Sequence, residues 1–170
     1  MAQYFNISGE LTQELLAPGD NVTVSSVSLT NAHHTGFSKA DLYIQKRNKG
    51  KFYLLKGVEL PVGATLVLDD VSFKNSAREF GLYIKLTKVP NAFTLTGTID
   101  PAASTTVPGV NTKFISEIIV GDEIVVSGET KTVSAIASDT SLTVSQAFSN
   151  NDNDTSPDVL PQALVDVIIK

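Results

Sequence analysis

The sequence predicts an all-β protein, an antiparallel β-sandwich with a small β-barrel-like domain inserted before its last strand. Thr, Val, Ser, Leu and Ile dominate the chain, and apolar residues recur near every second position, as in strands that bury one face. Turn-forming clusters separate these segments at intervals of about ten residues, which is typical of sandwiches and barrels. With 42% hydrophobic and 18% charged residues, the chain has enough apolar material for a core.

The first half of the chain supplies the strands of the expected sandwich. A turn cluster at Pro18–Asn21 precedes an alternating segment, Val22–Leu29, whose phase slips at Ser25-Ser26 as a β-bulge would cause. The other alternating segments predict strands at Leu42–Ile44, Lys51–Lys56, Leu66–Leu68 and Leu82–Leu86. The best helix candidate is Gly9–Leu16.

The expected inserted domain covers residues 92–157. A new alternating pattern begins at Leu95, and the spacing of Phe114 and Ile118 predicts one helical turn at Thr112–Ile119. Gly128-Glu129 is read as a two-residue type II′ hairpin loop, which would place Val126 opposite Lys131. The polar run Asn150–Pro157 reads as an exit linker.

The carboxyl-terminal segment decides between an insertion and two separate domains. Leu164–Lys170 alternates like a strand, but a lone strand cannot bury its apolar face and therefore needs a sheet. We expect it to pair antiparallel with Leu82–Val89, so that residues 1–91 and 158–170 form one domain. The alternative is a carboxyl-terminal domain that keeps this strand for itself.

Composition excludes several classes of function. The chain has no Cys, so disulfides and thiolate metal sites are absent. We expect no signal peptide, no membrane span and no membrane partner, because no apolar run approaches the roughly 20 residues that cross a bilayer. The net charge of -5 argues against a nucleic-acid partner, since such binders normally carry a basic face.

Groups of residues that could carry chemistry are few. We read His33-His34 as solvated loop histidines, because neighbours in an extended segment diverge and a metal needs several converging ligands. Asn150, Asp152 and Asp154 have the spacing of a calcium loop but lack its Gly and final Glu, so a polar linker is favoured. Asp69-Asp70 reads as a solvated turn. We therefore expect no enzyme activity, no catalytic residue, no metal and no cofactor.

Two groups of residues are candidates for contact with a partner. Lys46, Arg47, Lys49 and Lys51 form the basic cluster of a hairpin tip, which is either simply solvated or an electrostatic contact with an acidic neighbour. Tyr43 and Tyr83 occupy the polar phase of their strands, so we expect partial exposure. With Phe52 and Tyr53 they offer a carbohydrate-stacking platform, although packing is the simpler interpretation.

Two stretches resemble structural proteins of bacteriophage virions. Within Thr94–Phe148, the order of turns and apolar positions is similar to a small β module of tailed phages; the residues that carry it are Thr96–Ile99, Phe114, Ile118, Val120–Ile124, Gly128-Glu129, Ile136, Ser138–Thr140 and Leu142. Tyr53–Val58, Pro61–Gly63 and Leu66–Leu68 resemble small virion proteins of phages, including cyanophages.

The resemblance implies a non-enzymatic virion component and carries over no catalytic or ligand residue. We expect a capsid decoration or stabilising protein, located in the virion, present as a homo-oligomer or in many copies, with other virion subunits as partners. The alternatives are a neck or tail component, or an adhesin module that binds a host surface or carbohydrate.

Overall fold

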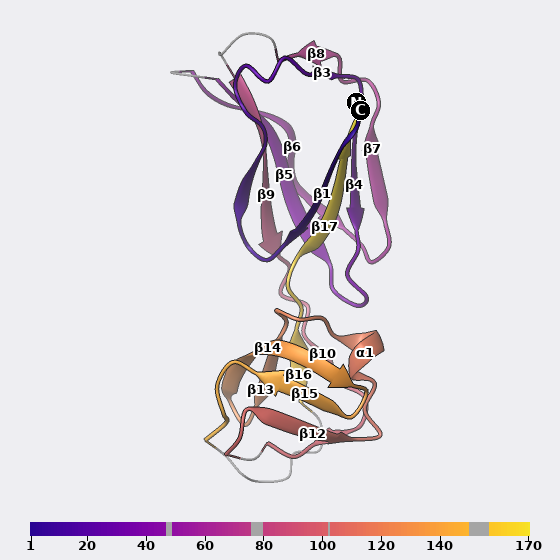
Figure 1. Ribbon diagram of the computed structural model, residues 1–170, viewed down its shortest axis with the longest axis vertical. Helices are drawn as coiled ribbons and strands as arrows, with labels where there is room; N and C mark the ends of the chain where they lie inside the picture. Colours follow the sequence, from indigo (N-terminus) through magenta and orange to yellow (C-terminus); the bar gives the residue numbers. More distant parts are fainter. Residues whose placement is uncertain (47–48, 76–79, 102, 150–156) are drawn as a thin grey trace. The chain divides into compact units, whose positions relative to one another are not determined.

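The computed structural model describes residues 1–46, 49–75, 80–101, 103–149 and 157–170, and in these ranges the protein is almost entirely β (Figure 1). Every strand pairing in the described part of the chain is antiparallel. The predicted all-β class is confirmed. The chain forms two compact units, one of Met1–His33, Phe37–Val89 and Ala163–Lys170, the other of His34–Gly36 and Pro90–Gln162.

The first unit contains two four-stranded sheets. The first sheet has the order β1 (Gln3–Ser8), β17 (Leu164–Ile169), β4 (Val27–Asn31) and β7 (Thr65–Leu68). The second has the order β2 (Thr12–Leu16), β9 (Phe80–Lys88), β5 (Ser38–Lys46) and β6 (Gly50–Leu60). A short ladder joins β3 (Thr23–Val24) and β8 (Phe73–Lys74).

Both sheets contribute to one hydrophobic core. Alternate residues of β17, Val165, Val167 and Ile169, are almost completely buried, and so are Leu42 of β5 and Ile84 of β9. The intervening residues of each strand face the other way. Period-two alternation in the sequence therefore corresponds to one buried face on each sheet.

The last strand does not pair with Leu82–Val89, so that prediction is wrong. Instead β17 lies between β1 and β4, with Val167 opposite both Phe5 and Leu29. Strand β9 has no free edge for it, because β2 and β5 hydrogen-bond to its two sides. The chain leaves the first unit after β9, in the second sheet, and returns as β17, in the first sheet. The order of the segments in the sequence could not indicate this change of sheet.

The helix predicted for Gly9–Leu16 is also wrong, because Thr12–Leu16 is strand β2. A helix of this length is marginal without tertiary support, whereas pairing with β9 satisfies the backbone of the segment. A bulge between Glu14 and Leu16 brings Leu15 and Leu16 both into buried positions. Two adjacent apolar residues therefore fit a strand.

The second unit is built on a seven-stranded sheet and one helical turn. The strand order is β10 (Phe93–Thr94), β16 (Asp158–Leu160), β13 (Glu123–Val126), β14 (Glu129–Ser138), β15 (Ser141–Val144), β12 (Thr106–Val110) and β11 (Thr98–Ile99). Helix α1 (Phe114–Glu117) confirms the predicted helical turn. Phe114, Ile124 and Phe148 belong to a second core, separate from that of the first unit.

The second unit extends beyond the expected limit at residue 157. Strand β16 pairs with β13 and β10, and the unit ends at Gln162. The buried carboxylate of Asp122 explains this end, because it accepts hydrogen bonds from the backbone N–H groups of Ile119 and Gln162. The predicted linker falls largely on residues 150–156, outside the described ranges.

The β13–β14 hairpin turns one residue earlier than expected. Ser127 and Gly128 have φ of 49° and 83°, and Val126 pairs with Glu129. Positive φ at both central residues is the signature of a type I′ turn, whose twist matches that of the flanking strands. The predicted type II′ loop at Gly128-Glu129 is wrong, and Ile124 rather than Val126 lies opposite Lys131.

Neighbouring isoleucines at the end of β17 provide a matched test of this arrangement. Ile169 is 1% exposed in the shared core, while Ile168 lies on the outer face. We expect Ile169→Ala to lower the free energy of unfolding by about 2–5 kcal/mol and Ile168→Ala by less than about 1 kcal/mol. Urea denaturation of the two variants measures the difference. Equal losses would contradict the assignment of Ile169 to the core.

Candidate functional site

Four side chains form a row across the outer face of the second sheet of the first unit. Glu14 of β2 lies opposite Tyr83 of β9, Tyr83 lies opposite Tyr43 of β5, and Tyr43 lies opposite Tyr53 of β6. Residues opposed in this way are the closest side-chain neighbours in a sheet. The backbone register therefore places three aromatic rings and one carboxylate side by side.

The three rings contact one another along the row. The ring centroids of Tyr43 and Tyr83 are 5.7 Å apart with 13° between their planes, a stacked pair. Those of Tyr43 and Tyr53 are 5.5 Å apart and tilted by 54°. Aromatic pairs of this kind contribute about 0.5–1.5 kcal/mol each beyond the area they bury. The row thus stabilises the pairing of β9, β5 and β6 through side-chain contacts on the outer face of the sheet.

Two lysines cover the rings. The Lys51 Nζ lies 4.4 Å from the centroid of Tyr43, and the Lys56 Nζ lies 5.1 Å from the centroid of Tyr53. Both lysines are exposed, and exposed cation–π contacts contribute about 0.5–1 kcal/mol each. We call Tyr43, Tyr53, Tyr83, Lys51 and Lys56 the tyrosine–lysine face.

Tyr43 differs from its expected exposure. It points away from the core, as its strand phase predicted, yet it is 1% exposed. The flanking rings of Tyr83 and Tyr53 and the side chain of Lys51 account for this burial. The expectation of partial exposure is therefore wrong for Tyr43 and correct for Tyr83, which is half-buried.

The structure separates the remaining members of the predicted basic cluster. Lys46 packs over Phe52, 5.8 Å from the ring centroid, on the side of the sheet that carries Ile44. Lys49 is exposed, and Arg47 lies outside the described residues. Phe52 is therefore not part of a platform with the tyrosines. Among the three tyrosines of the row, Tyr53 is the most accessible to a ligand, since 42% of that residue is exposed.

Sequence reasoning missed two participants, Glu14 and Lys56. Glu14 lies on β2, where the sequence predicts a helix, so no sequence signal indicates its place beside Tyr83. For Lys56, the sequence predicts only the end of a strand.

The Tyr83–Glu14 contact alters the acidity of the tyrosine. The Tyr83 hydroxyl donates a hydrogen bond to a carboxylate oxygen of Glu14. This bond, with smaller contributions from burial and from the charges of Glu14 and Tyr43, raises the pKa of Tyr83 from 10.0 to about 12. The protonated hydroxyl is the form that the native state stabilises.

The sign of this shift predicts how stability depends on pH. The contribution of Tyr83 is present below pH 10 and is lost as the pH rises through about 12, because the unfolded chain releases the proton first. We expect Tyr83→Phe to lower the free energy of unfolding by about 0.5–1.5 kcal/mol at neutral pH, and this difference to shrink above pH 10.

Denaturant unfolding at several pH values, together with titration of tyrosinate absorbance, measures both effects. Tyr4→Phe is the control, because Tyr4 is 71% exposed and lies on the other sheet. A tyrosinate transition near pH 12 that persists in Tyr83→Phe would refute the assignment.

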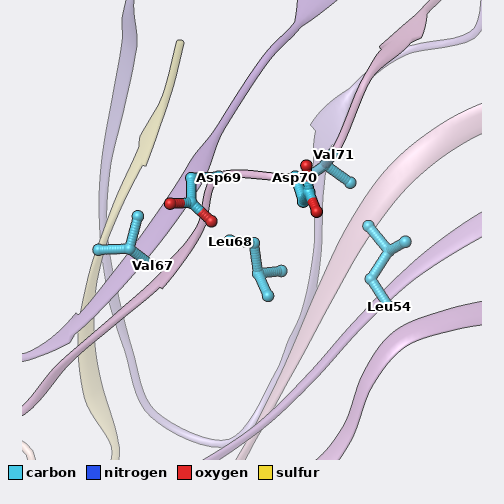
Figure 2. Close-up of a pocket in the computed structure, with 6 residues that line it drawn as sticks. All are labelled: Leu54, Val67, Leu68, Asp69, Asp70 and Val71. Atoms are coloured by element: carbon cyan, nitrogen blue, oxygen red, sulfur yellow. The ribbon is translucent and has the colours of Figure 1, made fainter.

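A small pocket lies between edge strand β6 and edge strand β7 with its following loop. It has a volume of about 230 Å³ and is lined by Leu54, Val67, Leu68, Asp69, Asp70 and Val71. Figure 2 shows the carboxylates of Asp69 and Asp70 apart from each other rather than converging. Both residues are exposed, so the interpretation of a solvated turn holds for them. The pocket is smaller than the usual range for small-molecule sites, about 300–1,000 Å³.

The histidine pair is not a solvated pair. His33 is 2% exposed and donates its backbone N–H to the Asn31 side-chain oxygen, whereas His34 is exposed. Burial of His33 corrects the prediction that both are solvated. Across the described ranges, no group of three or more His, Cys, Asp or Glu side chains is placed to hold a metal. The Asn150–Asp154 segment lies outside those ranges.

Comparisons with known proteins add little. No protein-family model matches the chain, and no curated protein matches it. A chain from the structure of infectious bursal disease virus Gx strain aligns over 99% of this chain with 9% identity and a TM-score of 0.24. This chain spans 40% of that chain's length. A similarity at this TM-score supports no conclusion about fold or function. In the described residues, no helix is long and apolar enough to cross a membrane.

Proposed function

We propose that this chain is a non-enzymatic structural protein of a bacteriophage virion, a capsid decoration or stabilising protein that binds neighbouring subunits through its tyrosine–lysine face. The observation that carries the proposal is the in-register row of Tyr83, Tyr43 and Tyr53 covered by two exposed lysines. The resemblance of Thr94–Phe148 and Tyr53–Leu68 to phage virion proteins supplies the virion assignment.

The face has the chemistry of a protein-binding surface for an acidic partner. Tyrosines supply large contact area at a small cost in conformational entropy, and aromatic residues are enriched where proteins meet. Lys51 and Lys56 add positive charge beside them, and neither forms an ion pair with another described residue. By contrast, the Nζ of Lys39 on the same sheet lies 3.7 Å from a carboxylate oxygen of Glu59. An acidic neighbour would complement the two lysines and accelerate encounter.

The face is also rigid before binding. Tyr43 is fixed by rings on both sides and Tyr83 by its hydrogen bond to Glu14. A surface whose side chains are already ordered loses little entropy on association. Such preorganisation suits a subunit that must add repeatedly to equivalent positions on a shell.

Charge reversal on the face tests the proposed function. We expect Lys51→Glu/Lys56→Glu to reduce incorporation of the chain into purified virions by at least about tenfold, because like charges would then face the acidic neighbour. Wild-type binding to particles that lack the chain should weaken as salt rises. Quantitative mass spectrometry of purified particles gives the copy number, and an electron-microscopy map gives the position.

Lys74→Glu/Lys170→Glu is the matched control, since it changes the net charge equally at two exposed lysines of the same unit. It should incorporate like the wild type. Absence of the chain from virions, combined with micromolar binding on a glycan array, would replace the proposal with the carbohydrate-binding alternative. A map that shows the chain at the neck or tail would correct the capsid assignment.

A further inference from the structure

Strand β1 is an edge of the first sheet. In the described part of the chain it pairs with β17 alone (Figure 1). Just beyond the strand, the Gly9 N–H donates to the Ala163 carbonyl at 2.8 Å, and the direction of the backbone groups alternates along a strand. Odd-numbered residues of β1 therefore bond to β17. The N–H and C=O groups of Tyr4, Asn6 and Ser8 point to the open side of the sheet.

The side chains of β1 are incompletely covered. Ile7 is 2% exposed, whereas Phe5, which packs on the same core, is only partly buried. On the outer face, Tyr4 is 71% exposed. A strand added beside β1 would cover more of Phe5 and would give the outward backbone groups protein partners in place of water.

The other edge strands of the described sheets carry features that hinder pairing. Strand β7 has four residues, and β3, β8, β10 and β11 have two each. Strand β2 is bulged, and β6 has register shifts against β5 and carries the exposed Lys51 and Lys56. By contrast, β1 has six residues, an uninterrupted register with β17 and no charged side chain. An edge without such protection is the kind that pairs with another strand.

We propose that β1 pairs antiparallel with β1 of a second copy of this chain, about a two-fold axis at Asn6. Residues that share a face must lie opposite each other, so even-numbered residues meet even-numbered ones. With Asn6 on the axis, Tyr4 lies opposite the second copy's Ser8, and every outward backbone group of β1 gains a partner. On the core side, Phe5 lies opposite the second copy's Ile7, so two apolar side chains meet.

The contact is isologous, because the same strand serves both copies, and it therefore closes at two. It joins the two first sheets into one continuous sheet of eight strands. The other described edges are short, bulged or charged, which favours β1 itself as the second strand. The dimer goes beyond the proposed function and uses none of its residues, since the tyrosine–lysine face belongs to the second sheet.

Sedimentation equilibrium of the full chain tests for the dimer. A contact made mainly by one short strand is small for a protein interface, so we expect a dissociation constant of about 0.1–1 mM and a mass that rises from 18.1 kDa toward twice that value. The constant should change less than about threefold between about 0.02 M and 0.5 M salt, because no charge takes part. A wild type that stays monomeric at about 1 mM would overturn the inference.

A proline variant distinguishes backbone pairing from other contacts. Tyr4→Pro removes an N–H that the monomer leaves unpaired, and proline is tolerated at such positions of an edge strand. We expect it to weaken dimerisation at least about tenfold, whereas Tyr4→Ala, which keeps the N–H, should weaken it less than about threefold. Circular dichroism checks that both variants are folded. Equal effects of the two substitutions would argue against pairing through the backbone and would reject the proposal.

Single cysteines test the register. The chain has no Cys, so a disulfide-linked dimer reports the introduced residue alone. Asn6→Cys places two thiols opposite each other at the axis, with Cα atoms about 5.5 Å apart, within disulfide range. Ser8→Cys is the matched control on the same face of the strand, because its two copies would lie more than about 13 Å apart. In a glutathione redox buffer, we expect at least about tenfold more linked dimer for Asn6→Cys.

Equal cross-linking at the two positions would indicate random collision and would also overturn the inference. The outcomes are separable from failure of the proposed function, since Lys51→Glu/Lys56→Glu should leave cross-linking through Asn6→Cys unchanged. A monomeric chain that still needs Lys51 and Lys56 to enter virions loses only the dimer. A chain that dimerises through β1 but is absent from virions loses only its virion assignment.

Discussion

The two hydrogen-bonding edges of β17 are the constraint on which the first unit depends. A strand in the middle of a sheet must satisfy its backbone groups on both sides, and β17 does so with β1 and β4. Val165, Val167 and Ile169 at the same time fill the core that both sheets share. The first unit is therefore incomplete until the last residues of the chain are present, although its other strands all precede residue 90.

This constraint explains why the second unit can be inserted between strands β9 and β17. Loop-closure entropy grows only with the logarithm of loop length, so a long excursion costs little more than a short one once its residues fold by themselves. The second unit has its own core, which includes Phe114 and Ile124, and its own buried polar anchor at Asp122. It therefore contributes its own stability and does not draw on the core of the first unit.

The sequence predicted the class of the fold because apolar residues at every second position indicate a strand, whichever strands it pairs with. It predicted the helical turn because Phe114 and Ile118 are spaced for one. It could not predict which strand β17 joins, because the alternation of Leu164–Lys170 fits any edge that exposes an apolar face. It misread Thr12–Leu16 because two adjacent buried leucines suit a helix unless a bulge lets both turn inward.

The tyrosine–lysine face shows the same limit of prediction from sequence. Tyr43, Tyr83 and Lys51 were identified from strand phase and charge, which are local properties. Their contact with Tyr53 and Glu14 depends on the register of four strands, which is a property of the folded sheet. Burial of Tyr43 is the clearest example, since strand phase correctly placed it on the outer face and only its neighbours cover it.

The tyrosine–lysine face stabilises the sheet, and the partner recognition that we propose for it would fall on a different part of the same row. The stacked pair Tyr43–Tyr83 and the hydrogen bond to Glu14 lie toward β2 and act mainly within the sheet. Tyr53 lies on the edge strand β6, where 42% of the residue is exposed, and the Lys56 ammonium group lies over its ring. An edge strand with exposed charge resists pairing with stray strands, because a lysine there must be desolvated before a new strand can add. The same lysines that protect this edge are those that an acidic surface would recognise. Under the proposed function, protection against non-specific pairing and selection of a partner would therefore follow from one arrangement of residues.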